Sequence, residues 1–252
     1  MGQKLNDRIE SIELFGFNIN TSINELSVDS DQKIVVNTIN PHSYCISKRD
    51  KLFSNALHAS DILLPDGVGI VIASKFVNRK SIRKIAGYDL FLHLMHTLNK
   101  SNGSCFFLGA SQNTLDLIES KAKYEYPNVT VHSYSPPYKN SFSQEDSDKM
   151  CMMVNAHKPD VLFVGMTAPK QEKWVFNFKD HLDANIICSI GAVFDFYAEN
   201  VKRPHRFWIK IGLEWFPRFI KEPRRLAERN LVSTPKFILE MLSQKLFGKG
   251  IL

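Results

Sequence analysis

One carboxylate, Asp66, stands where a general base would be placed. It lies between Pro65 and Gly67, directly after Asp61–Leu64 (DILL), an apolar run typical of a buried strand. A carboxylate at the end of such a strand can accept the proton of an attacking hydroxyl group. Asp66 is equally suited to cap the helix expected after it, and its position alone does not separate the two roles.

Other expected strands also end in polar or glycine-containing turns. These turns are Thr38-Ile39-Asn40-Pro41, Pro65-Asp66-Gly67-Val68-Gly69, Gly109-Ala110-Ser111, the stretch from Gly165 to Glu172, and Gly191-Ala192. In open parallel sheets, ligands bind outside the carboxyl ends of the strands. Five strand ends are therefore expected to converge on one crevice.

Two glycine-containing turns could approach a phosphate group. Gly109 follows a strand and Ser111 opens a helix, so backbone N–H groups and the helix dipole would favour an anion there. An ordinary turn with Ser111 as the helix cap explains the same residues. Gly67-Val68-Gly69 begins like a dinucleotide fingerprint, but Ile72 stands at the third glycine position, and no GxxxxGK[ST] motif occurs.

The sequence offers little for a metal ion. Asp-Ser-Asp occurs at 29–31 and at 146–148, but both copies lie in polar stretches away from the strand ends. The eight histidines show no HExxH motif and no other spacing of metal ligands. We therefore expect a metal-independent protein without a cofactor.

The pattern along the chain predicts an α/β fold. The expected strands are Lys33–Ile39, Asp61–Leu64, Ser104–Leu108, Val129–Ser133, Asp160–Val164 and Asn185–Ile190, and the expected helices cover 42–58, 67–77, 88–100, 111–126, 143–157 and 168–181. Most strands are unbroken apolar runs, as in sheets covered on both faces. We expect a Rossmann-like, mostly parallel sheet with helices on both faces, formed by residues 1–200. Residues 201–252 are expected to form a helical, basic appendage with breaks before its prolines, including Pro235.

Composition suggests a cytosolic chain. The four cysteines are scattered and form no CxxC, so free thiols in a reducing compartment are expected. The N-terminus lacks an apolar signal region, and no run of 18 apolar residues occurs. If the protein meets a membrane, it is expected to lie on the surface.

The C-terminal segment carries most of the positive charge. Residues 201–252 hold 12 Lys/Arg against 4 Asp/Glu, a net charge of +8, whereas residues 1–200 hold 20 against 22. Bulky apolar residues such as Trp208, Trp215 and Phe216 stand among these cations. Such a mixture suits an anionic interface, either a membrane surface or a nucleic acid, although a core-packed helix with a solvated basic face is also compatible with it.

Several of these elements together resemble one family, the WecG/TagA/CpsF bacterial glycosyltransferases. In chain order the matching elements are Thr38-Ile39-Asn40-Pro41, Leu64 to Gly69 (LPDGVG), Ile85 to Asp89 (IAGYD), Ala168 to Trp174 (APKQEKW), Gly191 to Phe196 (GAVFDF), Gly212 to Arg218 (GLEWFPR) and Glu222 to Arg225 (EPRR). Each element is weak evidence by itself. Their common order over residues 38–225 makes the resemblance specific.

The resemblance implies a cytosolic enzyme that acts peripherally on the inner face of the cell membrane. Its donor would be a UDP-sugar and its acceptor a polyprenyl-diphosphate-linked sugar, with inversion at the anomeric carbon. The products are intermediates of bacterial cell-surface polysaccharides or teichoic acids. The donor sugar stays open among N-acetylmannosamine, its uronic acid and hexoses, and so does assembly into a homo-oligomer.

The resemblance also implies roles for particular residues. Asp66 matches the catalytic base, Thr38, Asn40 and Gln171 match residues of the substrate pocket, and Asp89 and Gly109 are further substrate-binding candidates. Arg218 and Arg225 match arginines that hold the lipid diphosphate. The family usually has arginine where this chain has Lys84, with Arg83 directly before it, so either cation is a candidate for phosphate binding. His205 also stands where a small residue is common.

Two other classes of protein compete with this interpretation. A nucleic-acid-binding α/β protein with a basic C-terminal arm would explain the charge of the tail, but it would leave the strand-end crevice without a role. An NAD-dependent oxidoreductase would need the glycine fingerprint that the sequence lacks.

Overall fold

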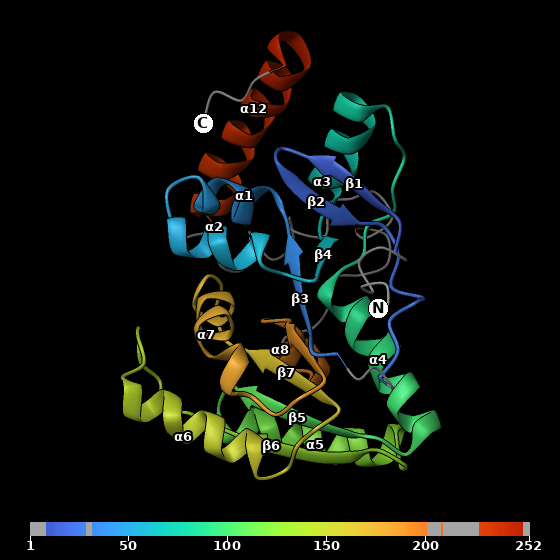
Figure 1. Cartoon of the computed structure of the whole chain (residues 1–252), viewed down its shortest axis with the longest axis vertical. Helices are drawn as coiled ribbons and strands as arrows, with labels where there is room; N and C mark the ends of the chain where they lie inside the picture. The colour runs from blue at the N-terminus through green and yellow to red at the C-terminus, as the bar shows by residue number, and fades with distance from the viewer. Residues whose placement is uncertain (1–8, 29–31, 201–207, 209–226, 249–252) are drawn as a thin grey trace.

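The structure is a computed structural model, and it describes residues 9–28, 32–200, 208 and 227–248. A parallel sheet of six strands forms its centre (Figure 1). In chain order the strands are β3 (Ile34–Ile39), β4 (Ile62–Pro65), β5 (Ser104–Gly109), β6 (Thr130–Tyr134), β7 (Val161–Gly165) and β8 (Ile186–Ser189). Their order across the sheet is β4-β3-β8-β7-β5-β6, and every pairing is parallel. The predicted α/β fold with its six strands is thereby confirmed.

Helices cover both faces of the sheet. One face carries α4 (Gly87–Ser101), α5 (Gln112–Glu125) and α8 (Val193–Tyr197), and the other carries α1 (Pro41–Ser47), α2 (Lys51–His58), α6 (Gln144–Asn155) and α7 (Lys170–Phe178), which is followed by the short η3 (Lys179–His181). Strands β5, β7 and β8 are almost wholly buried, as expected for strands that are covered on both sides.

Local sequence explains where the helices begin. The side chains of Asn40, Asp50, Ser111 and Ser143 each accept a backbone N–H of the first turn of α1, α2, α5 and α6. The cap at Asp50 divides the helix predicted for 42–58 into α1 and α2. The helix predicted for 67–77 is present as α3 (Val68–Ala73) and continues into the π-helical segment η2 (Ser74–Asn78).

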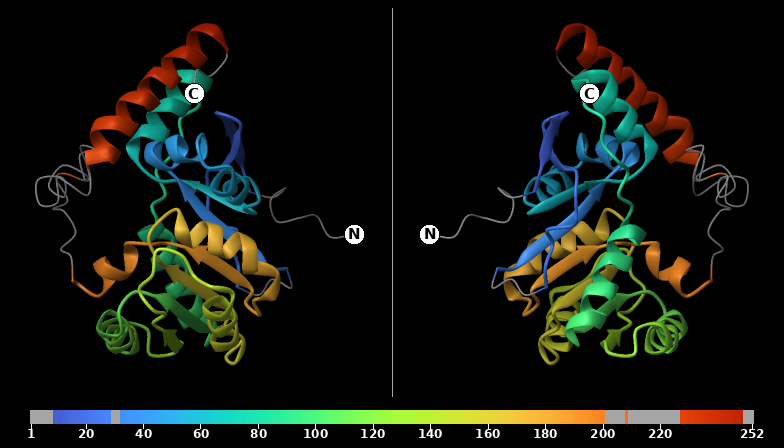
Figure 2. Two further views of the ribbon diagram at one scale, coloured as in Figure 1. Left: turned by 90° about the vertical axis from the view of Figure 1, so that its left-hand side faces the viewer. Right: turned by 90° about the vertical axis from the view of Figure 1, so that its right-hand side faces the viewer.

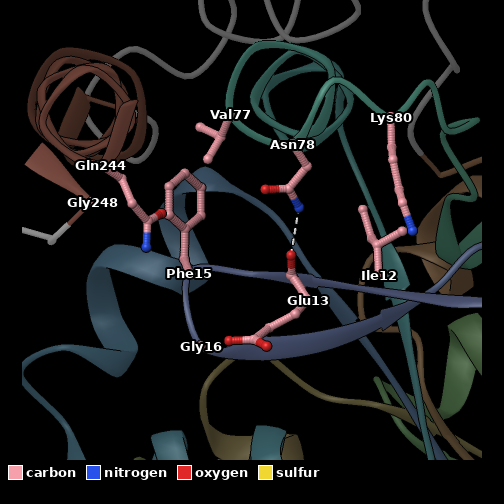
Figure 3. Close-up of a pocket in the computed structure, with 9 residues that line it drawn as sticks. All are labelled: Ile12, Glu13, Phe15, Gly16, Val77, Asn78, Lys80, Gln244 and Gly248. Atoms are coloured by element: carbon pink, nitrogen blue, oxygen red, sulfur yellow. Dashed lines mark hydrogen bonds between the residues drawn. The ribbon is translucent and has the colours of Figure 1, made fainter. Parts of the chain in front are cut away.

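An N-terminal hairpin was not predicted from the sequence. It pairs β1 (Ser11–Leu14) with β2 (Phe17–Asn20) in antiparallel register and contacts the edge strand β4, where Asn20 Oδ1 accepts the N–H of Leu63 at 2.9 Å. A pocket of about 550 Å³ is lined by residues of this hairpin, η2 and the C-terminal helix (Figure 3). Its lining residues are Ile12, Glu13, Phe15, Gly16, Val77, Asn78, Lys80, Gln244 and Gly248.

The described part of the C-terminal segment packs on the body. The π-helical η4 (Glu228–Ser233) runs directly into α12 (Thr234–Phe247), so the helical conformation changes from π to α one residue before Pro235 instead of stopping. Proline is tolerated there because it lies in the first turn. Phe237 joins the buried cluster of the hairpin and α1, and Glu240 Oε1 accepts a hydrogen bond from Tyr44 Oη at 2.8 Å. None of the described helices is long and apolar enough to cross a membrane.

Candidate active site

Asp66 lies at the carboxyl end of the edge strand β4, beside the end of β3. Its backbone N–H donates to Ile39 O at 2.8 Å, and its side chain is half-buried. Gly67 has φ +95°, a conformation that L side chains rarely adopt, and it turns the chain directly into α3. This arrangement holds Asp66 at the carboxyl end of β4, which is the position predicted from the sequence.

Asn40 and Thr38 come from the neighbouring strand end. Asn40 Oδ1 accepts the N–H groups of His42 and Ser43, both at 3.0 Å, so its carbonyl oxygen is used to cap α1. The NH₂ of Asn40 is therefore the part of this amide that could meet a substrate. Thr38 pairs with Leu64 across the two strands and is half-buried. The structure thus brings Thr38, Asn40 and Asp66 together at the ends of β3 and β4.

Gln171 lies in the first turn of α7, the helix that follows β7, and is only 4% exposed. Its Oε1 accepts the N–H of Met166 at 3.2 Å, and its Nε2 donates to Glu172 Oε1 at 2.9 Å. Only β8 separates β7 from β3, so the carboxyl ends of these two strands stand about two strand spacings apart, roughly 10 Å. That span suits a sugar, but in this structure both ends of the Gln171 amide bind protein atoms. Its predicted contact with substrate stays a prediction.

The loop with the candidate cations is tied to the same edge of the sheet. The N–H of Ile85 donates to Pro65 O at 2.9 Å, which places Lys84 and Arg83 in the loop beside Asp66. Lys84 is half-buried and Arg83 is exposed. Asp89 Oδ2 accepts the N–H of Ala86 at 2.9 Å and so caps α4. The described geometry therefore assigns a structural contact to Asp89 and leaves both cations as candidates for phosphate.

Gly109 marks the point where the connections of the sheet diverge. The chain leaves β5 toward β6 and leaves β7 toward β8, so neighbouring β5 and β7 form a switch point of the kind that binds ligands in open sheets. Gly109 has φ +120°, and a Cβ there would lie 2.6 Å from Gly165 O. Close approach of β5 and β7 thus requires glycine, whether or not a phosphate binds.

Glu172 was not among the residues that the sequence marked as site candidates. It is buried on α7, and burial raises its carboxyl pKa to about 7. Its Oε2 lacks a hydrogen-bond partner among the described residues, as do the buried Asn37 Oδ1, Ser189 Oγ and Trp174 Nε1. Asn37 and Ser189 directly follow the paired residues Val36 and Cys188 on β3 and β8. The only sequence signal was a carboxylate beside Gln171, which by itself does not indicate burial.

Other predicted residues lie elsewhere or outside the described chain. Arg218, Arg225 and His205 lie outside the described residues, as does Asp-Ser-Asp 29–31. In the second copy, Asp146 binds Lys139 Nζ at 2.7 Å and caps α6 with Ser143. Within the described ranges no group of three or more His, Cys, Asp or Glu could hold a metal ion. The 550 Å³ pocket contains none of the predicted site residues.

Comparison with known proteins agrees with the resemblance seen in the sequence. The profile of the glycosyl transferase WecG/TagA/CpsF family matches residues 9–250. An N-acetylglucosaminyldiphosphoundecaprenol N-acetyl-beta-D-mannosaminyltransferase of Bacillus subtilis (strain 168) is 33% identical over 217 residues, which cover 85% of this chain and 82% of the relative. Proteins of the same name from Bacillus spizizenii (strain W23) and Staphylococcus aureus (strain MW2) are 28% and 21% identical, each over 86% of this chain and 82% of the relative. With Asp66 at the strand-end edge and the family profile spanning nearly the whole chain, this protein belongs to the WecG/TagA/CpsF family of glycosyltransferases.

Proposed function

We propose that this enzyme transfers N-acetylmannosamine from its UDP derivative to N-acetylglucosamine carried on a polyprenyl diphosphate, with inversion at the anomeric carbon. The observation that carries the proposal is the B. subtilis relative, whose name states this acceptor and a β-linked product. Two further relatives carry the same name. The sequence left the donor sugar open among several candidates, and these relatives favour N-acetylmannosamine.

The chemistry of the site supports such a transfer. The Asp66 carboxylate would take the proton of the acceptor hydroxyl while its oxygen attacks the anomeric carbon. The bond from that carbon to the UDP oxygen breaks, and UDP leaves with the bonding electrons. Attack opposite to the leaving group inverts the configuration, so an α-linked donor yields a β-linked product.

Positive groups near the strand ends would offset the charge that develops on UDP. Lys84 or Arg83 stands in the loop beside Asp66, and backbone N–H groups follow Gly109. Fixed charges and dipoles of this kind stabilise a leaving diphosphate without a metal ion. Arg218 and Arg225 are proposed to hold the acceptor diphosphate, and the enzyme to act on the inner face of the cell membrane.

A donor panel tests the proposal. Purified full-length enzyme would be offered UDP-N-acetylmannosamine, its uronic acid, UDP-glucose and UDP-glucuronate with a synthetic lipid-diphosphate N-acetylglucosamine, with products identified by mass spectrometry. We expect one N-acetylmannosamine to be added, and the same result in EDTA. Transfer of a different sugar would refute the donor assignment, and loss of activity in EDTA restored by Mn²⁺ would refute the metal-independent mechanism. A gel shift with DNA or RNA tests the nucleic-acid-binding alternative in parallel.

A further inference from the structure

An exposed apolar surface joins the catalytic body to the C-terminal helix. Of the 15 large hydrophobic residues that are exposed in the described chain, ten lie in two short segments, 68–76 and 231–247. In α3 and η2 they are Val68, Ile72 and Phe76, spaced four residues apart along one side. In η4 and α12 they are Leu231, Val232, Ile238, Leu239, Leu242, Leu246 and Phe247. We call these ten residues the apolar face.

Helix α12 packs on the body with one side and exposes apolar residues on the opposite side. Its inner side buries Phe237, Glu240 and Ser243 against the body. At 3.6 residues per turn, Ile238, Leu242 and Leu246 project from the opposite side, where Leu246 is 72% exposed. A helix that only packed on the body would carry polar residues there. The exposed side of α12 is therefore suited to an apolar partner.

The two segments form one continuous surface. Lys245 Nζ of α12 lies 5.7 Å from the centre of the Phe76 ring of η2. Both side views in Figure 2 show α12 running beside the helix of residues 68–78. The apolar face therefore combines residues of the catalytic body with residues of the C-terminal helix.

Within segments 68–80 and 231–247 every exposed charge is positive, and the acidic Glu228 at the start of η4 is paired with Arg49. Segments 68–80 and 231–247 contain Lys75, Arg79, Lys80, Lys236 and Lys245, all exposed, and a single acidic residue, Glu240, which is buried. Apolar side chains bordered by lysine and arginine suit an anionic lipid surface, into which the apolar groups insert while the ammonium groups reach the headgroups. A twofold contact with a second copy would bring the same five cations against themselves, which is unfavourable.

We propose that the apolar face inserts into an anionic membrane surface, and that α3 and η2 of the catalytic body are part of the insertion site together with α12. This inference rests on the proposed function, because a lipid-linked acceptor lies in that surface. Val68 follows Asp66 by only two residues, and Ile72 lies four residues further on, about 6 Å along α3. Insertion of α3 places Asp66 at the headgroup layer, which is about 5–8 Å thick and contains the acceptor diphosphate.

Flotation of the full-length protein with vesicles tests insertion directly. Vesicles would contain equal parts phosphatidylglycerol and phosphatidylcholine, or phosphatidylcholine only, and no acceptor. The test variant is Ile72→Ser with Phe76→Ser, and its matched control is Tyr124→Ser with Tyr138→Ser, two aromatic residues that are 88% and 98% exposed elsewhere. The test variant should bind anionic vesicles at least about tenfold more weakly, while the control binds like the wild type. Leu239→Ser with Leu242→Ser should act like the test variant.

Activity separates this inference from the proposed function. The Ile72/Phe76 variant should keep wild-type turnover on a short-chain, water-soluble acceptor and lose activity on an acceptor in vesicles, with an unchanged melting temperature. Wild-type vesicle binding by this variant would overturn the inclusion of α3 and η2 even if transfer is confirmed. If instead the variant abolishes a dimer seen by sedimentation while vesicle binding is unaffected, the apolar face contacts a second copy and the inference is wrong. Binding to vesicles without any transferase activity would contradict the proposed function and leave insertion standing.

Discussion

The function of Asp66 depends on a carboxylate that can accept a proton. Asp66→Asn keeps the side-chain volume and removes the basic oxygen, so turnover should fall by about 10²–10⁴-fold while UDP binding is retained. Steady-state kinetics with a soluble acceptor measure the first effect, and titration calorimetry with UDP measures the second.

Asp61 provides a matched control at the opposite end of the same strand. Its Oδ2 accepts the N–H of Val35 at 2.8 Å, a contact that the amide oxygen of Asp61→Asn can keep. This variant should turn over normally. If Asp66→Asn is as active as Asp61→Asn, Asp66 is a helix-capping residue and the base lies elsewhere.

Glu172 makes stability depend on pH, because burial raises its folded-state pKa to about 7 from a usual value near 4.5. The folded protein then binds more protons than the unfolded chain between about pH 4.5 and 7. The contribution of Glu172 is therefore fully present below pH 4.5 and is lost as pH rises through 7, by roughly 3 kcal/mol in the free energy of unfolding. Glu172→Gln should remove this loss.

Urea unfolding of the wild type and Glu172→Gln at several pH values checks this dependence. The difference in stability between the two proteins should grow in favour of the variant from pH 4.5 to 8. Glu199→Gln is a control of opposite sign, since the hydrogen bond from Lys121 holds the pKa of Glu199 below its usual value. The stabilisation by ionised Glu199 is present at neutral pH and is lost as pH falls below about 4.5, so the difference between the wild type and Glu199→Gln should shrink only at acidic pH. Parallel curves for the wild type and Glu172→Gln would exclude a buried, neutral Glu172.

At the scale of elements, the buried ring of Phe237 packs α12 against the body. Phe237 is 2% exposed and contacts the rings of Phe15 and Tyr44, with centroid distances of 5.2 and 5.6 Å. Phe237→Ala should lower the free energy of unfolding by about 3–5 kcal/mol. Phe247→Ala, which removes a ring of the same helix that is 75% exposed, should change it by less than about 0.5 kcal/mol.

Chemical denaturation of both variants measures this contrast. Equal stability would mean that α12 is not docked on α1 in solution. The result also bears on the predicted domain boundary at residue 200. Removal of everything after Asn200 would delete Phe237 and Glu240, so the remaining body would expose Phe15 and the hydroxyl group of Tyr44.

At the scale of the whole molecule, positive charge is concentrated at the C-terminal end. The net charge is +8 over residues 201–252 and −2 over residues 1–200. Each cation near an anionic bilayer contributes about 1 kcal/mol, and salt screens this attraction. Binding of the full-length protein to phosphatidylglycerol vesicles should therefore weaken steadily as NaCl is raised, whereas binding to phosphatidylcholine vesicles should change little. Salt-independent binding to both would show that the cations do not contribute.

The sequence by itself determined the fold class, the six strands and the family. Unbroken apolar runs such as Val161–Gly165 can only be covered on both faces, so they indicate a parallel sheet with helices around it. The strand-end positions of Asp66, Gly67 and Gly109 could also be predicted, because each residue stands at the end of an apolar run. Boundaries were accurate to one or two residues where a capping residue such as Asn40 or Ser143 marks the helix start.

Only the tertiary structure decided which distant residues meet. The order β4-β3-β8-β7-β5-β6 brings Asn37 beside Ser189 and leaves only β8 between the ends of β3 and β7, because strand order depends on long-range packing and not on local pattern. The hairpin β1–β2 escaped prediction, since its two four-residue strands are stabilised by contacts with β4, α1 and Phe237. The burial of Glu172 and the contact between Phe76 and Lys245 also depend on elements that are far apart in the chain. Neither feature could be predicted from the spacing of residues in the sequence.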